Sequence, residues 1–585
     1  MYMLNISSPE HNFTLPLVEG SLAVISFLLS FAFPKLVPAR ILRVESALGR
    51  LAKRQGIAVL SIGLSAFLLR LAVFPLLPIP LPTLPDDFSA LLAADTFAHG
   101  RLTNPTPAMW IHFESLHIDM KPTYMSMYFP AQGLILAAGK ALFGHPWFGI
   151  WITSVLMCAG ICWMLQAWLP PQWALLGGFF AVLRLGLFSY WVNSYTGGGT
   201  IAALGGALVL GALPRLMRTL RIRYSLLMAV GIVLLGTTRP YEGFLLCIPV
   251  AAALVYWLLR ERVHPAPAAV FRCAAPALAF LIAAAAWMGY YNYRVFGSPL
   301  TLPYTVNRAT YATAPYFVWQ SPRPEPFYHH QEMRRFYQLD ELADYKRVHS
   351  RSGFAAMTLV KAIRSIYFLT GFALLPLLLL LPRTLLDRRI RFLVLCLIVL
   401  GVGAAAEIYF FPHYLAPFTA AFYAVGLQST RHLWHWSPSG QRVGRTVVRL
   451  SVTLCLVLAG LRPFDRALHI PVPQRPVSTW ILNWFGPDHY DTQRAAVERS
   501  LAQTPGGQLA IVRYSASHDP LDEWVYNAAD IDSSKVIWAR EMDASSNLEL
   551  LRYYKDRKVW LVQPDLDPVG VAPYPLTEEI TATSH

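Results

Sequence analysis

The chain has 585 residues, of which 55% are hydrophobic, 13% aromatic and only 14% charged. A soluble globular protein carries about 25% charged residues, so this composition excludes an ordinary soluble domain and predicts repeated membrane crossing. The net charge of +15 is explained by basic connections that face anionic lipid headgroups, and it requires no nucleic-acid partner.

Apolar runs recur along most of the chain and predict an all-α polytopic membrane bundle. A helix rises 1.5 Å per residue, so about 20 apolar residues cross a hydrocarbon core of roughly 30 Å. Twelve runs are candidate spans: residues 17–33, 57–77, 147–169, 173–190, 200–213, 224–238, 243–259, 273–291, 366–381, 392–411, 414–427 and 447–461.

The basic residues predict the orientation of this bundle. Arginine and lysine cluster in the short connections after the first, fifth, seventh, ninth and eleventh runs, with Arg40, Arg215 and Arg260 as examples. Because short cytoplasmic loops retain such residues, we expect these connections on the cytoplasmic face and both termini outside. The loop at residues 292–364 is also rich in arginine, but long loops cross largely regardless of charge.

The pattern divides the chain into three parts. Residues 1–56 hold a first span and a basic cytoplasmic connection, and residues 57–461 hold the membrane core with outer loops 78–146 and 292–364. In residues 462–585 the stretches QLAIVRY, SKVIWAR and RKVWLVQPD are typical of short strands, and SSNLELLRYYKD has a helical period. The tail is therefore expected to be a small extracytoplasmic α/β domain, whose charged clusters HDPLDEW and AREMD we interpret as loop polarity rather than as a catalytic site.

Two adjacent carboxylates, Asp86 and Asp87, follow the span at residues 57–77. A carboxylate at the membrane edge stays ionised within reach of a lipid headgroup, which suits a general base. The alternative is that one of the pair caps the helix that follows.

Other outer-face segments supply polar residues that converge on the same pocket if the spans form one bundle. They are His112, Glu114, His117, Arg239, Tyr241, Glu242, Arg294, His413 and Tyr414. Arg239, Arg294 and His413 are candidates for binding a lipid phosphate, because cationic donors stabilise charge on a departing phosphate. The alternative for each arginine is that it extends to the membrane surface only to keep its charge in water.

A divalent metal is a further possibility. His112, Glu114 and His117 are spaced so that two or three of them could meet at one ion, although a hydrogen-bond network is the commoner outcome. Gly197, Gly198 and Gly199 allow close approach of a ligand, but no nucleotide-binding pattern surrounds them, so a nucleotide-sugar site is not supported.

The acidic pair in the first long outer loop, the later YFPAQG segment and the many spans resemble the GT-C superfamily of integral membrane glycosyltransferases. The chain looks most like relatives of the protein O-mannosyltransferases and lipid A aminoarabinose transferases, in an uncharacterised bacterial branch. Those relatives carry Asp-Glu and Pro-Pro where this chain has Asp86-Asp87 and Phe129-Pro130. The similarity covers about residues 57–427.

The resemblance implies inverting transfer of a sugar from a polyprenyl-phosphate donor to a glycan, lipid or protein acceptor outside the cytoplasm. Asp86 would be the base, Asp87 would orient it or bind the acceptor, and Arg239 and His413 would hold the lipid phosphate. Glu114 would be a secondary acid or metal ligand. No cofactor is required, and we expect a multi-pass protein of a bacterial inner membrane with its site on the periplasmic side.

Two other classes of function fit the same spans. A transporter or flippase of lipid-linked sugars would use similar phosphate-binding cations, but transporters keep ionisable sites near the bilayer midplane, where this chain offers chiefly Arg70 and Arg184. A scaffold that binds envelope partners through its tail would not need the acidic pair.

Overall fold

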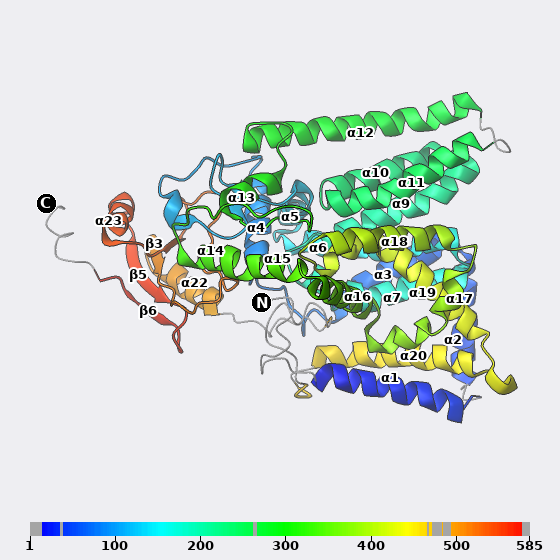
Figure 1. Cartoon of the computed structure of the whole chain (residues 1–585). Helices are drawn as coiled ribbons and strands as arrows, with labels where there is room; N and C mark the ends of the chain where they lie inside the picture. The colour runs from blue at the N-terminus through cyan, green and yellow to red at the C-terminus, as the bar shows by residue number, and fades with distance from the viewer. Residues whose placement is uncertain are drawn as a thin grey trace.

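The computed structural model describes residues 14–34, 39–260, 266–464, 467–470, 483 and 493–575. They form a long helical bundle with a small sheet beyond one end, and short helices and loops lie between the two (Figure 1). The predicted fold class, a helical membrane bundle with a small C-terminal α/β part, is confirmed.

Eight helices in the described residues are long and apolar enough to cross a membrane. They are α1 (Thr14–Ala32), α3 (Gln55–Ala72), α6 (Trp147–Trp168), α9 (Gly199–Thr219), α11 (Pro240–Leu259), α12 (Pro267–Phe296), α16 (Arg351–Leu374) and α20 (Val443–Leu461). Two more apolar helices are shorter, α10 (Ile222–Gly236) and α18 (Arg391–Ala406). The protein is therefore a multi-pass membrane protein, while the count of twelve spans stays a prediction.

The remaining two predicted runs are interrupted helices. In the first, α7 (Pro171–Ala181) passes into a π-helical turn at Val182–Gly186, followed by the short α8 (Tyr190–Asn193). In the second, α19 (Thr419–Trp434) is preceded by a 3₁₀ turn at Pro412–Phe418. That turn contains two prolines, which donate no backbone hydrogen bond and so disfavour a regular α-helix there.

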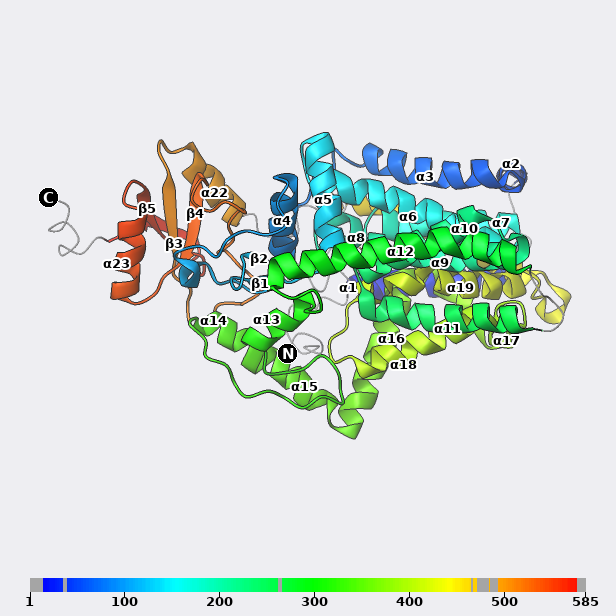
Figure 2. The ribbon, with the colours of Figure 1, turned by 90° about the horizontal axis from the view of Figure 1, so that it is seen from above.

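The two ends of the bundle differ in character. Figures 1 and 2 show α2 (Ala39–Lys53) and α17 (Leu381–Leu385) at the end away from the sheet. Arg40, Arg43 and Arg50 lie on α2, so basic residues gather at this end. At the other end lie α4 (Pro85–Ala98), α5 (Pro130–Phe143), α13 (Pro303–Tyr311), α14 (Gln331–Arg334) and α15 (Leu342–Val348).

The C-terminal sheet has four strands in the order β4-β3-β5-β6. Its strands are β3 (Gln508–Val512), β4 (Val536–Arg540), β5 (Lys558–Gln563) and β6 (Gly570–Pro573). β3 pairs in parallel with β4 and β5, and β6 runs antiparallel to β5. The helices α22 (Gln493–Gln503) and α23 (Ala544–Tyr553) accompany it. The three predicted strands and the predicted helix between the last two are confirmed as β3, β4, β5 and α23.

The sheet packs directly on the outer loop that follows α4. Leu509 and Ile537 share one buried cluster with Leu92 of α4 and with Phe113 and Tyr124 of that loop. That loop continues into β1 (Ile118–Asp119) and β2 (Met125–Ser126), an antiparallel pair. Because apolar burial stabilises by about 25 cal/mol per Å², this shared core fixes the loop against the sheet.

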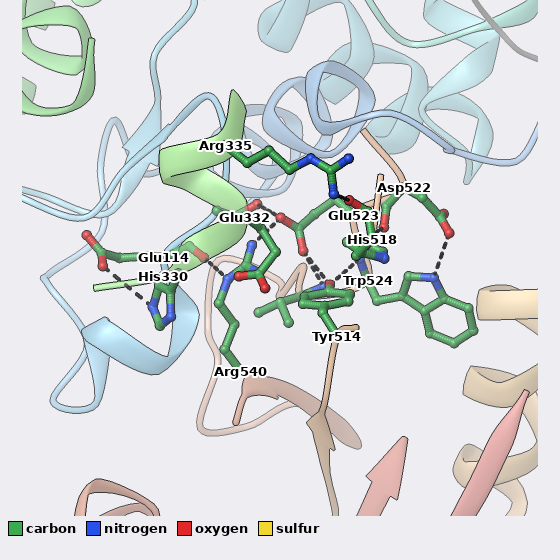
Figure 3. Close-up of polar contacts among 12 residues, drawn as sticks. Glu114, His330, Glu332, Arg335, Tyr514, His518, Asp522, Glu523, Trp524 and Arg540 are labelled. Atoms are coloured by element: carbon green, nitrogen blue, oxygen red, sulfur yellow. Dashed lines mark hydrogen bonds and ion pairs between the residues drawn. The ribbon is translucent and has the colours of Figure 1, made fainter. Parts of the chain in front are cut away.

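A buried ion pair of the tail lies at the same junction (Figure 3). The guanidinium of Arg540, at the end of β4, donates to the carboxylate of Glu523, and the two side chains are 3% and 2% exposed. Arg540 Nε also donates to the carbonyl of Glu114 at 2.7 Å, and Arg540 Nη1 lies 3.6 Å from Glu332 Oε2. The interpretation of the charged tail clusters as loop polarity is therefore wrong for Arg540 and Glu523, which fasten the tail to the outer loops.

Candidate functional site

The two adjacent carboxylates point in different directions. Asp87 is buried and accepts hydrogen bonds from the backbone N–H groups of Thr83 at 3.2 Å, Leu84 at 3.4 Å and Tyr195 at 2.9 Å. Pro85 opens α4, so Asp87 stands in its first turn and caps it. Burial raises the pKa of Asp87 to about 7, against these hydrogen bonds. Asp87 thus fulfils the capping alternative and ties α4 to the turn at residue 195.

Asp86 instead faces an open pocket, with 26% of its side chain exposed. The hydroxyl of Tyr128 donates to Asp86 Oδ1, and His117 Nδ1 lies 3.5 Å from Asp86 Oδ2. Burial raises the pKa of Asp86, but His117, the Tyr128 hydrogen bond and the charge of Arg239 outweigh it and hold the pKa below its ordinary value. Asp86 is therefore an ionised carboxylate that can accept a proton.

The pocket contains about 400 Å³ of unfilled space, part of it open to solvent. Asp86 lines it together with the small side chains of Ala90 and Ala93 and with residues of the segment 126–133. The remaining lining residues are Gly197 and Gly198 of the turn before α9, Thr238, Arg239 and Tyr304. The lining of this space therefore includes both a carboxylate, Asp86, and a guanidinium, Arg239.

Arg239 is held by three elements. Its Nε and Nη2 each donate to the carbonyl of Gly197 at 3.3 Å, and its guanidinium lies 4.4 Å from the ring centre of Tyr414. Glu242 Oε1 is 3.9 Å from Arg239 Nη1, so Glu242 balances its charge from one helical turn away. Tyr241 points elsewhere, because its hydroxyl donates to the carbonyl of Gly403.

His413 is not among the residues that line the pocket, but its ring lies against Gly197, which is. The Tyr190 hydroxyl is 2.7 Å from its Nδ1, and a side chain at Gly197 would meet the His413 ring at 2.7 Å. Burial and the charge of Arg239 lower the pKa of His413 well below its ordinary value. His413 is therefore neutral, and it supports the turn at Gly197 rather than supplying a positive charge.

Arg294 is not among the residues that line the pocket. It is exposed, and its Nη1 donates to the hydroxyl of Tyr290 one turn earlier on α12. Its surroundings match the alternative of an arginine at the membrane surface.

The three residues predicted to hold a metal do not form one ligand set. His112 contacts the carbonyls of Arg540 and Ser546 at 3.0 and 3.2 Å, whereas His117 faces Asp86. Glu114 accepts from Tyr311 at 2.8 Å and contacts His329 at 2.7 Å.

The backbone explains the separation, because a 3₁₀ turn ends at Phe113 and His117 has a positive φ of 64°. In the described part of the chain, no three His, Cys, Asp or Glu side chains are grouped to hold a metal ion.

Sequence reasoning missed Tyr128, Gln132, Thr238 and Tyr304, which line the pocket. Tyr128 stands one residue before Phe129-Pro130, in a segment already singled out, so its position next to the helix start was the available signal. Tyr304 ends the outer segment YNYRVFGSPLTLPY that follows the eighth apolar run, and it reaches the pocket of Asp86 from α13.

No protein-family model and no curated protein matches this chain. Among solved structures, apo ArnT from Cupriavidus metallidurans is similar with a TM-score of 0.46 and 13% identity, over 88% of this chain and 93% of that chain. The Archaeoglobus fulgidus AglB oligosaccharyltransferase, in complex with an inhibitory peptide and a dolichol-phosphate, has a TM-score of 0.44 and 12% identity, over 86% and 69%. The same organism's oligosaccharyltransferase in complex with Zn and sulfate has 0.45 and 13%, over 86% and 67%.

ArnT and AglB are thus similar to this chain in fold, at identities of 12–13%. At these scores the likeness is too loose to carry an argument about residues or substrates. The argument for function therefore starts from the pocket.

Proposed function

We propose that the protein is a membrane glycosyltransferase that moves a sugar from a polyprenyl-phosphate-linked donor to a hydroxyl of an extracytoplasmic glycan, lipid or protein, with inversion. The observation that carries the proposal is a single pocket lined by both the ionised Asp86 and the buried Arg239. Transfer of a glycosyl group needs a base for the acceptor and a cation for the departing phosphate, and this pocket offers both.

The chemistry follows from these positions. Asp86 takes the proton of the acceptor hydroxyl, whose oxygen then bonds to the anomeric carbon from the side of Asp86. The bond from that carbon to the phosphate oxygen breaks, and the phosphate leaves with the electron pair. Arg239 stabilises the charge that gathers on the phosphate. Glu242 and Tyr414 keep the guanidinium in place.

The two arginines expected near the bilayer midplane do not favour the transporter alternative, because Arg70 lies in the last turn of α3 and Arg184 in the π-helical turn after α7. Arg70 donates to the carbonyls of Leu77 and Pro78 at 2.7 and 3.2 Å. Arg184 donates to the carbonyls of Tyr367 and Phe368 at 3.2 and 3.0 Å. Both side chains therefore satisfy backbone groups of the bundle.

The pocket is proposed to open on the periplasmic side of a bacterial inner membrane, since it lies at the end opposite the basic α2. Cysteine labelling tests this orientation. In the variant Arg294→Cys, the introduced thiol should react with an impermeant reagent in intact spheroplasts. In Arg388→Cys, which changes the basic connection after the ninth apolar run, the thiol should react only after lysis. Of the native cysteines five are buried and Cys247 is half-buried, which keeps the background low. The reverse pattern would refute the orientation.

The decisive test of the function is mass spectrometry of envelope lipids, glycans and proteins from cells with and without this protein. We expect one glycosylated species to disappear when the protein is removed and to return with the wild-type chain but not with Asp86→Asn. Identical glycosylation in both cell types would contradict the proposal.

A further inference from the structure

The start of α9 has a backbone geometry that favours glycine. Gly197 and Gly198 have φ values of 80° and 62°, in the left-handed region that favours glycine. A Cβ at Gly198 would lie 2.4 Å from Thr238 Cγ2. The absence of side chains brings the backbone itself to the surface of the pocket.

This turn opens a helix of 21 residues whose N-terminal end has no side-chain cap at Gly198. The first N–H groups of a helix have no intrahelical acceptor, and together with the helix dipole they favour a bound anion. The carbonyl of Gly197 is turned toward Arg239 and accepts from it, so it does not oppose an anion at the helix start.

Two buried polar atoms beside the turn point independently to a ligand. Thr238 and Gln132 are 7% and 8% exposed, and both line the pocket. Within the described residues, neither Thr238 Oγ1 nor Gln132 Oε1 has a hydrogen-bond partner. Gln132 Nε2 donates to the carbonyl of Tyr195 at 2.8 Å, which leaves its Oε1 as an acceptor. Buried polar groups are rarely left unpaired, so these atoms are expected to bind something the chain itself does not supply.

We propose that the glycine turn at the start of α9, with Thr238 and Arg239, is the cradle for the phosphate of the donor. The N–H groups at the helix start and the Thr238 hydroxyl donate to phosphate oxygens that Arg239 neutralises. Gln132 Oε1 accepts from a hydroxyl of the attached sugar. The proposal rests on the proposed glycosyl transfer and deepens it by naming the group that binds the leaving phosphate. It assigns the binding of the phosphate mainly to backbone N–H groups, one hydroxyl and one arginine.

Binding rather than transfer tests this cradle, so that its failure is distinguishable from failure of the proposed function. Native mass spectrometry of the full-length protein in detergent measures binding of undecaprenyl phosphate, undecaprenol and inorganic phosphate. Thr238→Val keeps the shape of the side chain and removes the hydroxyl. A hydrogen bond to a charged group contributes about 1.5 kcal/mol or more, so undecaprenyl phosphate should bind about tenfold more weakly.

Thr237→Val is the matched control, because the hydroxyl of Thr237, directly after α10, donates to the carbonyl of Val233 in that helix. We expect it to bind undecaprenyl phosphate as the wild type does, and both variants to bind undecaprenol equally. Weaker binding of either phosphate by Thr238→Val supports the cradle, and the arm that responds shows whether lipid phosphate or free phosphate is recognised.

Gly198→Ala should weaken phosphate binding more strongly, since its Cβ would displace Thr238. If this variant does not fold, the Thr238→Val comparison still decides. Unchanged binding of both phosphates by Thr238→Val would overturn the cradle, whereas loss of transfer in Asp86→Asn would still support the glycosyltransferase.

Discussion

The substitution Asp86→Asn tests whether Asp86, rather than Asp87, is the general base. Asparagine has nearly the same shape, and the Tyr128 hydroxyl can still donate to its Oδ1, so the fold should be retained. The side chain can no longer accept a proton from the acceptor. Loss of a general base lowers the rate by about 10² to 10⁴, or roughly 3 to 5 kcal/mol of transition-state stabilisation.

The assay is sugar transfer in proteoliposomes that contain a polyprenyl-phosphate sugar pool and the acceptor found by mass spectrometry. Asp87→Asn is the matched control, because one amide oxygen cannot replace a carboxylate that accepts from three backbone N–H groups. We expect it to lower the free energy of unfolding by about 1 to 3 kcal/mol while folded molecules stay active. Near wild-type transfer by Asp86→Asn would refute the assigned base.

Three further variants test the surroundings of the pocket. Tyr128→Phe removes a hydrogen bond that lowers the pKa of Asp86, so the acid limb of the pH profile of kcat/KM should move to higher pH; an unmoved limb would contradict that coupling. Arg239→Gln should weaken binding of undecaprenyl phosphate about ten- to a hundredfold, whereas Arg294→Gln should leave it unchanged; equal effects would remove Arg239 from the site. Arg540→Ala leaves the buried carboxylate of Glu523 without its positive partner, so the unfolding temperature should fall by an amount corresponding to about 3 to 5 kcal/mol, and limited proteolysis should release the tail; unchanged protease resistance would contradict the fastening role.

The apolar runs and the strand patterns made much of the fold predictable. Long stretches such as residues 147–168 and 243–259 have no alternative to a helix in lipid, because every backbone group must be satisfied within the segment. The run at residues 414–427 was harder to predict, since Pro412 and Pro417 turn its first part into a 3₁₀ turn.

The candidate site was predicted only in outline. The sequence placed Asp86, Arg239 and Tyr414 at one end of the bundle, and they do surround one pocket or support it. It also placed Arg294 there, which is exposed on α12, and it treated His413 as a cation although burial makes it neutral.

By itself the sequence determined that this chain spans a membrane, carries an acidic pair at the edge of a span and ends in a small α/β part, because these follow from composition and short-range periodicity. Only the tertiary structure decided which acid faces the pocket, since Asp87 is drawn away by a backbone group 108 positions later. In the same way His112 is held by the carbonyl of Arg540, 428 positions later. Hydrogen-bond partners so far apart leave no mark on local patterns, so the division of roles among neighbouring polar residues emerges only when the chain is packed.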